Sequence, residues 1–413
     1  MSDPEERRAI YQVLNSFFLY RKQAHYNITH VRRQSFYAMP QQHWQLLAAE
    51  PFNFLGTLES IDAAIDCNAE IAEAFLQTGL EFFDLPPTTA SNTPSLTSTP
   101  NPSDPEWRMP ADALNEEKAQ QTIRQLFRDW SAEGRPERNA CYGPVLDALN
   151  TEYLAVSDAN KGHIKVLVPG AGLGRLMFEI AVAGYAVEGN EFSYHQIVAS
   201  NHILNGTQRA GQYDLYPWIH GFSNHRTRAD QLLRVTVPDV HPATELERAS
   251  EGKAVHGFER MSFSSADFCV VYKEAASRGA YDAVATVFFI DTAPNLITYI
   301  ETVVNCLKDG GVWINVGPLK WHFENNPPEG RNRAEEGVPE GPKGRENLGV
   351  GEAGAVELTE DEVLALLERF GFRVEEFKSP VGRTGYVGNP NSMWNPMYLP
   401  SFWVARKIRH VGL

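Results

Sequence analysis

The chain has 413 residues, of which 43% are hydrophobic and 22% are charged, a balance typical of soluble globular proteins. This length allows one large hydrophobic core or two ordinary ones, and no apolar run approaches the ~18 residues of a membrane span. The formal net charge of −15 argues against general binding of nucleic acid, which needs a basic surface.

The first residues lack the basic and apolar regions of a secretory signal peptide. We therefore expect an intracellular, cytoplasmic protein, with the nucleus as a further location. The four cysteines are widely spaced and form no Cys-x-x-Cys pair, so we expect neither a disulfide framework nor a metal site.

The N-terminal region, residues 1–158, is predicted to be helical. The pattern Ser2-x-x-Glu5 with Pro4 is typical of a capped helix start. Apolar residues then recur at helical spacing in three stretches: Ile10–Phe18, Ile61–Phe83 and Asp112–Trp130. Between the last two, residues 86–105 are rich in Pro, Ser and Thr and are expected to form a linker.

From residue 159 to 413 strands and helices alternate, which predicts a mostly parallel α/β sheet covered on both faces. Seven strands are expected, at residues 164–168, 185–188, 261–264, 281–290, 312–316, 372–377 and 401–406. Helices are expected at 294–307 and 359–370, the second with a Thr359-x-x-Glu362 capping box and Gly371 at its end. Two insertions interrupt the pattern: 208–260, expected to be loop-like, and 326–355, expected to be disordered.

The most informative run is Val166–Arg175, where an apolar strand leads into the turn Gly170-x-Gly172-x-Gly174 and an apolar helical stretch follows. Glycines permit a tight turn that brings backbone N–H groups and a helix N-terminus close to a ligand. The spacing suits a nucleotide-like ligand but differs from that of dinucleotide-binding enzymes.

Two later positions restrict the class of ligand further. The next strand ends in Gly189-Asn190-Glu191, where a carboxylate can accept both hydroxyls of a ribose. After a further strand, Asp267 can accept the exocyclic amine of adenine while Phe268 covers the ring. Taken singly, each is better explained as an ordinary structural residue: a turn glycine, a surface Glu or a loop Asp. Together, in this order, they predict adenosine binding without a pyrophosphate, which fits S-adenosylmethionine.

From about Glu117 onward the chain resembles the carnosine N-methyltransferase family. The resemblance rests on Arg128-Asp-Trp-Ser, Glu137-Arg-Asn-Ala-Cys-Tyr142, Val168–Arg175, Gly189–Ser193, Leu215–His220, Phe288–Ala293, Trp313–Pro318 and His322-Phe-Glu324. It implies a class I S-adenosylmethionine-dependent methyltransferase with a Rossmann-like, mostly parallel seven-stranded sheet and a helical N-terminal region. It also implies a homodimer, for which the N-terminal apolar helices offer an interface.

The resemblance implies further cofactor contacts. Gln125 and Arg128, on the helix before the sheet, match family positions, and Arg128 would pair with the methionine carboxylate. By spacing alone, Arg128 reads as an ordinary surface helix arginine. A backbone contact after the fourth strand would fall near Val287.

The acceptor site is expected at Asp291, which ends an almost wholly apolar strand. From the sequence, Asp291 is either the N-cap of the following helix or a substrate ligand, and the resemblance favours the ligand. His322 and Tyr398 also match the family's substrate contacts, whereas alone they read as a structural histidine and a half-buried aromatic residue. Asn315 is a lower-ranked neighbour.

The implied reaction methylates the imidazole ring of carnosine (β-alanyl-histidine) to anserine, and that of related histidine-containing di- and tripeptides. We expect the Asp291 carboxylate to fix the imidazole tautomer and to stabilise the cation formed, while His322 and Tyr398 orient the acceptor. Two alternatives are methylation of a histidine in a protein or longer peptide, and a non-catalytic binding protein on the same fold.

Overall fold

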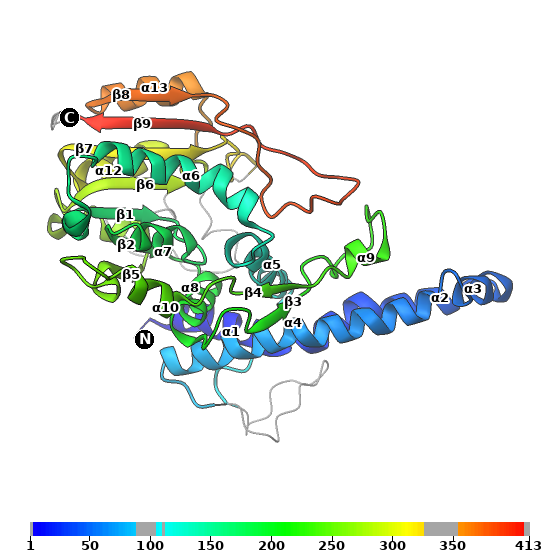
Figure 1. Cartoon of the computed structure of the whole chain (residues 1–413). Helices are drawn as coiled ribbons and strands as arrows, with labels where there is room; N and C mark the ends of the chain where they lie inside the picture. Colours follow the sequence, from blue (N-terminus) through cyan, green and yellow to red (C-terminus); the bar gives the residue numbers. More distant parts are fainter. Residues whose placement is uncertain (1–2, 88–104, 110–111, 326–353, 409–413) are drawn as a thin grey trace. The chain divides into compact units, whose positions relative to one another are not determined.

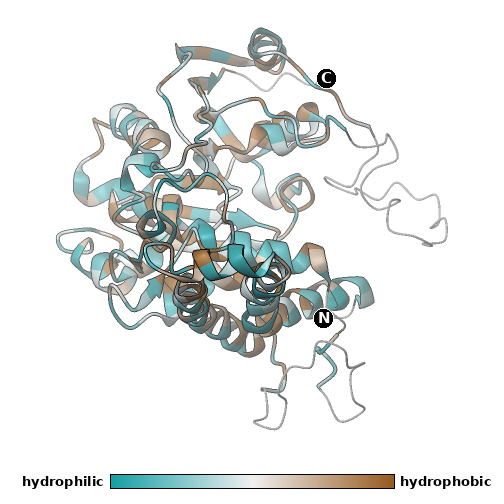
Figure 2. Ribbon diagram, turned by 90° about the vertical axis from the view of Figure 1, so that its right-hand side faces the viewer, coloured by the Kyte–Doolittle hydropathy of each residue, from teal (hydrophilic) through white to brown (hydrophobic). Residues whose placement is uncertain are grey.

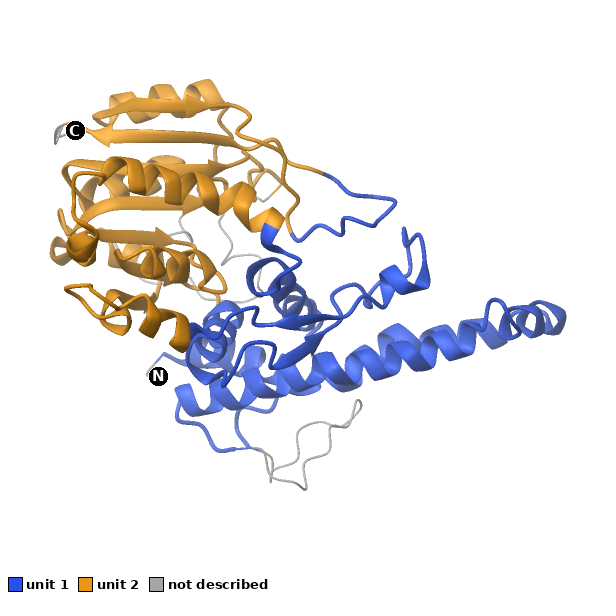
Figure 3. Cartoon of the chain, in the orientation of Figure 1, with its two compact units in different colours: residues 1–135, 194–242, 387–396 blue, residues 136–193, 243–386, 397–413 orange. Residues whose placement is uncertain are grey.

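The computed structural model describes residues 3–87, 105–109, 112–325 and 354–408. The chain forms two compact units, which Figure 3 shows in different colours. The first comprises Met1–Arg135, Tyr194–Pro242 and Val387–Pro396, and the second comprises Pro136–Ser193, Ala243–Tyr386 and Met397–Leu413. Most of the linker at 86–105 and of the insertion at 326–355 lies outside the described residues.

The first unit is mainly helical. Its helices are α1 (Pro4–Ala24), α2 (Val31–Tyr37), α3 (Gln41–Ala48), α4 (Phe54–Phe82), α5 (Ala113–Trp130), α8 (Tyr194–Asn201) and α9 (Arg228–Gln231). Turns of π-helix follow α1 at His25–His30 and α8 at His202–Gly206. Two short antiparallel strands, β3 (Tyr213–Leu215) and β4 (Val235–Val237), complete the unit.

The helices of this unit form because their apolar residues share one face. Ile10, Val13, Leu14 and Phe17 are all buried on α1, as the helical spacing predicts. Figure 2 shows hydrophobic and hydrophilic residues alternating along the helices. The helix start differs by one position from the prediction: the Asp3 side chain accepts the backbone N–H of Glu5 at 2.9 Å, whereas Ser2 lies outside the described residues.

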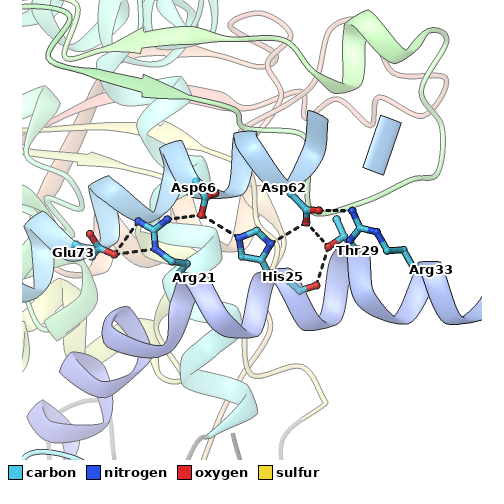
Figure 4. A network of polar contacts seen from close by, with 7 residues as sticks. All are labelled: Arg21, His25, Thr29, Arg33, Asp62, Asp66 and Glu73. Carbon is cyan, nitrogen blue, oxygen red and sulfur yellow. Dashed lines mark hydrogen bonds and ion pairs between the residues drawn. The ribbon is translucent and has the colours of Figure 1, made fainter. Parts of the chain in front are cut away.

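A network of charged side chains joins α1 and its π-helical turn to α4 (Figure 4). The two ring nitrogens of His25 face Asp62 at 2.9 Å and Asp66 at 3.1 Å. One turn earlier, Arg21 pairs with Glu73 at 3.0 Å and also with Asp66. Partly exposed ion pairs of this kind each contribute little to stability.

The second unit contains the predicted seven-stranded sheet. Its strands are β1 (Lys165–Pro169), β2 (Ala186–Glu191), β5 (Met261–Ser265), β6 (Tyr281–Val287), β7 (Leu307–Gly317), β8 (Phe372–Lys378) and β9 (Ser401–Lys407). They lie side by side in the order β5-β2-β1-β6-β7-β9-β8 (Figure 1). Neighbours from β5 to β7 are parallel, while β9 runs antiparallel to both β7 and β8. The expected mostly parallel sheet is therefore confirmed.

Helices cover this sheet. They are α6 (Arg135–Glu152), α7 (Arg175–Val182), α10 (Pro242–Arg248), α11 (Phe268–Val271), α12 (Leu296–Cys306) and α13 (Glu360–Arg369). The core on one face joins side chains of α11, α12 and α13 to Trp313 of β7 and Trp403 of β9. The predicted capping box of Thr359 and Glu362 is present, and Gly371 has a φ of 79° after α13.

One expectation about this region was wrong. Residues 208–260 are not a long loop, since they contain β3, β4, α9, α10 and a turn of 3-10 helix at Gly257–Arg260. Strands of three residues are too short for an alternating pattern to reveal them.

The strand order sets where a ligand can bind. The chain runs from β1 outward to β2 and β5, then returns to β6 on the other side of β1. In open α/β sheets ligands bind beyond the carboxyl ends of the strands at such a switch point. Among the described residues no helix is both long and apolar enough to cross a membrane, and no cluster of three or more His, Cys, Asp or Glu is arranged for a metal ion.

Candidate functional site

The glycine turn follows β1 and has the backbone shape that its sequence predicts. Gly170, Gly172 and Gly174 have φ angles of 67°, 55° and 77°, a region that residues with a Cβ rarely adopt. A Cβ on Gly170 would also lie 2.6 Å from the ring of Phe289. Gly174 directly precedes α7, so the turn delivers the chain into a helix N-terminus. The backbone of this turn and the close approach of Phe289 therefore both require glycine.

Glu191, the last residue of β2, is bound to this turn. One carboxylate oxygen accepts the N–H of Gly172 at 3.0 Å, and the other accepts those of Phe192 at 3.0 Å and Ser193 at 2.9 Å. Burial raises the pKa of the carboxyl, while these hydrogen bonds lower it in part. The structure thus brings together two predicted cofactor residues, Gly172 and Glu191, at neighbouring strand ends.

Asp267 and Phe268 follow β5 and play structural roles in the described fold. The Asp267 side chain caps α11 by accepting the N–H of Cys269 at 2.8 Å. The Phe268 ring is only 4% exposed and packs edge-on against Phe289 and Tyr299. Because this ring belongs to the core, its expected place over an adenine ring gains no support from the packing.

The end of β6 carries a strained residue that sequence reasoning missed. Val287, the predicted backbone contact, ends the strand beside Val316 of β7. The next residue, Phe288, has a φ of 52°, which a bulky residue adopts only at a cost. Its N–H donates to the carbonyl oxygen of Val316 at 2.8 Å. No sequence pattern predicts this conformation, since Phe is not a residue typical of turns.

Asp291 lies in a short helical turn, Ile290–Thr292, three residues further on. The cap of α12 is instead Asn295, whose side chain accepts the N–H of Ile297 at 3.1 Å. The two readings of Asp291 left open by the sequence are thereby separated, because the helix does not use this carboxylate. An asparagine directly before an apolar helical run was the available signal.

The Asp291 carboxylate is 3% exposed and only half engaged. Its Oδ2 accepts the N–H of Lys320 at 3.0 Å, whereas its Oδ1 is buried without a hydrogen-bond partner in the described part of the chain. Burial raises the pKa of this carboxyl to about 6, although the Lys320 N–H lowers it in part. A buried acceptor without a donor is costly, so Oδ1 is suited to a ligand N–H.

The structure brings His322 to the same place. The backbone N–H of His322 donates to the carbonyl oxygen of Asp291 at 3.0 Å, and its side chain is exposed. Tyr398 is linked less directly: its ring meets the Phe288 ring edge-on at 5.6 Å, and its backbone pairs with Thr384. Two predicted acceptor residues are therefore adjacent, and the third contacts the residue that starts the same turn.

Asn315 of β7 has a second unmatched polar group. It is fully buried, its Oδ1 accepts the hydroxyl of Thr286 at 2.9 Å, and its Nδ2 has no hydrogen-bond partner among the described residues. The sequence ranked Asn315 below the other acceptor residues and gave no indication that its side chain is buried.

Gln125 and Arg128 lie on α5 in the first unit. Arg128 binds the neighbouring carboxylate of Asp129 through Nε at 2.8 Å and Nη2 at 2.9 Å. Its side chain is 12% exposed, so the reading as an ordinary surface arginine does not hold.

Comparison with known proteins adds a consistent result. The profile of the family described as carnosine N-methyltransferase matches residues 105–409. Carnosine N-methyltransferase of Schizosaccharomyces pombe is 36% identical over 406 residues, covering 98% of this chain and 97% of that protein. The protein of the same name from Mus musculus is 33% identical, covering 97% of this chain and 86% of its own length.

A solved structure of magnesium protoporphyrin IX methyltransferase from Synechocystis covers 70% of this chain and 95% of its own. Its identity is 14% and its TM-score is 0.35, so the fold assignment rests on the strand order instead.

Proposed function

The chain belongs to the carnosine N-methyltransferase family, and on this basis we propose that it methylates the imidazole ring of carnosine to give anserine. The observation that carries the proposal beyond family membership is Asp291, a buried carboxylate with one unpartnered oxygen at the switch point of the sheet. Related histidine-containing di- and tripeptides present the same ring and are proposed as further acceptors.

The donor half would hold S-adenosylmethionine, which supplies a sulfonium methyl group when bound. Gly170, Gly172 and Gly174 would give the turn the backbone shape it needs beside the cofactor, since a Cβ here would strain the backbone and, at Gly170, would also meet the Phe289 ring. Glu191 would exchange part of its bonding to the turn for the ribose hydroxyls. We propose Gln125, Arg128, Asp267 and the backbone at Val287 as further cofactor contacts on the resemblance alone.

In the acceptor half, Asp291 Oδ1 would accept the N–H of one imidazole nitrogen. The lone pair of the other nitrogen would then be free to take the methyl group, with the electrons of the carbon–sulfur bond left on sulfur. The positive charge on the methylated ring would face the carboxylate, which would stabilise it, and the ring N–H proton would afterwards pass to water. A neutral imidazole is already abundant near pH 7, since its pKa is about 6.5, so the reaction needs no strong base. We propose that His322 and Tyr398 orient the ring or the peptide part.

Methyl transfer from radiolabelled S-adenosylmethionine tests the proposal. Purified chain is incubated with carnosine, with a histidine-containing tripeptide, or with a protein extract, and each product is separated by size. We expect label in carnosine, and loss of that label in Asp291→Asn. Label confined to protein would favour the protein-histidine alternative, and binding without any transfer would favour the non-catalytic one.

We also propose a homodimer and a cytoplasmic or nuclear location. In the first unit Tyr37, Leu46 and Phe52 are 54%, 63% and 53% exposed, and large apolar residues gathered in one segment suit an interface. Light scattering of the full chain should give twice the monomer mass, and the triple serine variant should give the monomer mass. Imaging of the tagged full chain decides the location.

A further inference from the structure

Four polar side chains of the first unit form a continuous hydrogen-bonded chain from α8 to the end of α5. Gln196 Nε2 donates to Gln125 Oε1 at 2.9 Å, and Gln125 Nε2 donates to Asp129 Oδ2 at 3.2 Å. Asp129 also accepts from Arg128, from Nε at 2.8 Å and from Nη2 at 2.9 Å. The Asp129 carboxylate thus binds both side chains that the family resemblance assigns to the cofactor.

Helix stability does not explain Asp129. It occupies the last turn of α5, where the helix dipole disfavours a negative charge, and it is only 1% exposed. A carboxylate buried at such a place costs free energy unless it is paired. Adjacent residues on a helix do not normally face each other, so Arg128 folds back to meet Asp129 instead of extending from the helix.

Gln196 sets the orientation of the Gln125 amide. If the Gln125 amide turned over, its oxygen would face the Asp129 carboxylate and its nitrogen would face the donor nitrogen of Gln196. The side-chain amide oxygen of Gln196, Oε1, is buried without a hydrogen-bond partner among the described residues. The amide is thus held toward Gln125 although its oxygen is left unsatisfied, which costs free energy.

We propose that Asp129 and Gln196 are positioning residues: they hold the Arg128 guanidinium and the Gln125 amide in the orientation that binds the carboxylate end of the cofactor. The inference rests on the proposed function, because it needs Gln125 and Arg128 to bind that ligand. A planar guanidinium recognises a carboxylate only in a defined orientation, and a side chain fixed before binding loses less entropy on binding.

The test measures the affinity of the purified full chain for S-adenosylhomocysteine by titration calorimetry. In Asp129→Asn the amide cannot accept two parallel N–H bonds from Arg128, so we expect the dissociation constant to rise about tenfold. Gln196→Ala, at a half-buried site, should raise it about threefold. The matched control is Gln121→Ala on the exposed side of α5, whose bond to Glu117 at 2.9 Å serves only the helix, and it should change the constant less than twofold.

A double-substitution comparison separates positioning from simple support of the fold. If Asp129 and Gln196 act through Gln125 and Arg128, neither substitution weakens binding further in a Gln125→Ala/Arg128→Ala background. Equal weakening in both backgrounds would overturn the proposal, as would unchanged affinity of Gln196→Ala in the native background. Gln196→Ala decides the matter even if Asp129→Asn does not fold.

The same measurements distinguish a wrong assignment of the cofactor contacts from a wrong positioning inference. If Arg128→Ala and Gln125→Ala leave the affinity for S-adenosylhomocysteine unchanged, the assignment of these two residues is wrong and the positioning inference falls with it. If they weaken binding while Asp129→Asn and Gln196→Ala do not, only the positioning inference is wrong.

Discussion

Replacing Asp291 by asparagine should remove most turnover while leaving cofactor binding intact. The amide keeps an oxygen for the Lys320 N–H, which Asp291 Oδ2 now accepts at 3.0 Å, and it keeps the size of the side chain. It removes the negative charge that would face the methylated ring. A charge-assisted hydrogen bond in a buried site is worth about 2–3 kcal/mol, which corresponds to a roughly 100-fold loss in kcat.

The pH dependence follows from the pKa of about 6 that burial gives this carboxyl. Acceptance of an N–H requires the ionised form, which falls from about 0.9 of the molecules at pH 7 to about 0.09 at pH 5. The ratio of wild-type kcat/KM to that of Asp291→Asn should therefore fall about tenfold over this interval. Titration of the acceptor imidazole and of other groups cancels in that ratio.

The assay is initial-rate methylation of carnosine at saturating cofactor between pH 5 and pH 8, with Asp309→Asn as the control. Asp309 is a 70% exposed carboxylate of the same unit, so its variant should follow the wild type throughout. A wild-type to Asp291→Asn ratio that stays constant with pH would refute the proposed role of the ionised carboxylate.

The same substitution should stabilise the fold. The folded pKa lies above the unfolded value of 3.8, so ionisation opposes folding, with full effect above about pH 6 and none well below pH 4. The difference between these values corresponds to about 3 kcal/mol. Asp291→Asn should thus melt at a higher temperature than the wild type at pH 7.5, with the gap closing toward pH 4; equal melting temperatures at pH 7.5 would contradict the burial cost.

Three further outcomes are expected. Gly172→Ala places a Cβ at a φ of 55°, costs about 1–2 kcal/mol in denaturant unfolding and weakens S-adenosylhomocysteine binding; an unchanged midpoint would contradict the strain. Glu191→Gln replaces an acceptor of backbone N–H groups by an amide donor, so calorimetry should show at least tenfold weaker binding, and unchanged affinity would exclude the ribose contact. Burial lowers the pKa of His195 to about 3 and those of His202 and His220 to about 4, so the unfolded chain takes up three protons first as pH falls below about 6.5. In the folded chain Asp291, with a pKa of about 6, takes up about one proton over the same interval and offsets part of this effect. The free energy of unfolding should therefore fall by up to about 3 kcal/mol per pH unit between pH 6 and 4.5, and a free energy that does not fall would show that these rings are not buried neutral.

Most of the sheet could be predicted because its strands are long enough to show their pattern. Each of the seven expected strands is present within a few residues of the predicted bounds, and β6 ends at Val287, not at residue 290. The predicted length of β6 was too great for a physical reason. Residues 288–290 are as apolar as the strand, but Phe288 turns the chain by adopting a positive φ. The hydrophobicity of a residue indicates whether its side chain is buried, but it does not indicate where the backbone turns.

The candidate site was predictable in its residue types but not in its contacts. An Asp before an apolar helical run fits a cap and a ligand equally well, and only the position of Asn295 in the helix start separates the two. The pairing of Arg128 with Asp129 was hidden for a different reason: neighbours in sequence rarely meet on a helix, so spacing gave no reason to link them.

The two halves of the proposed site differ in how their polar groups are satisfied. Glu191 already accepts three backbone N–H groups, so any ligand hydroxyl that it binds must replace part of this bonding. Asp291 has one oxygen engaged and one buried without a partner, so a ligand N–H adds a bond there and displaces none. Acceptor binding therefore removes a cost that the folded chain carries beforehand. The carboxylate that destabilises the fold is, for this reason, the group best prepared for the acceptor.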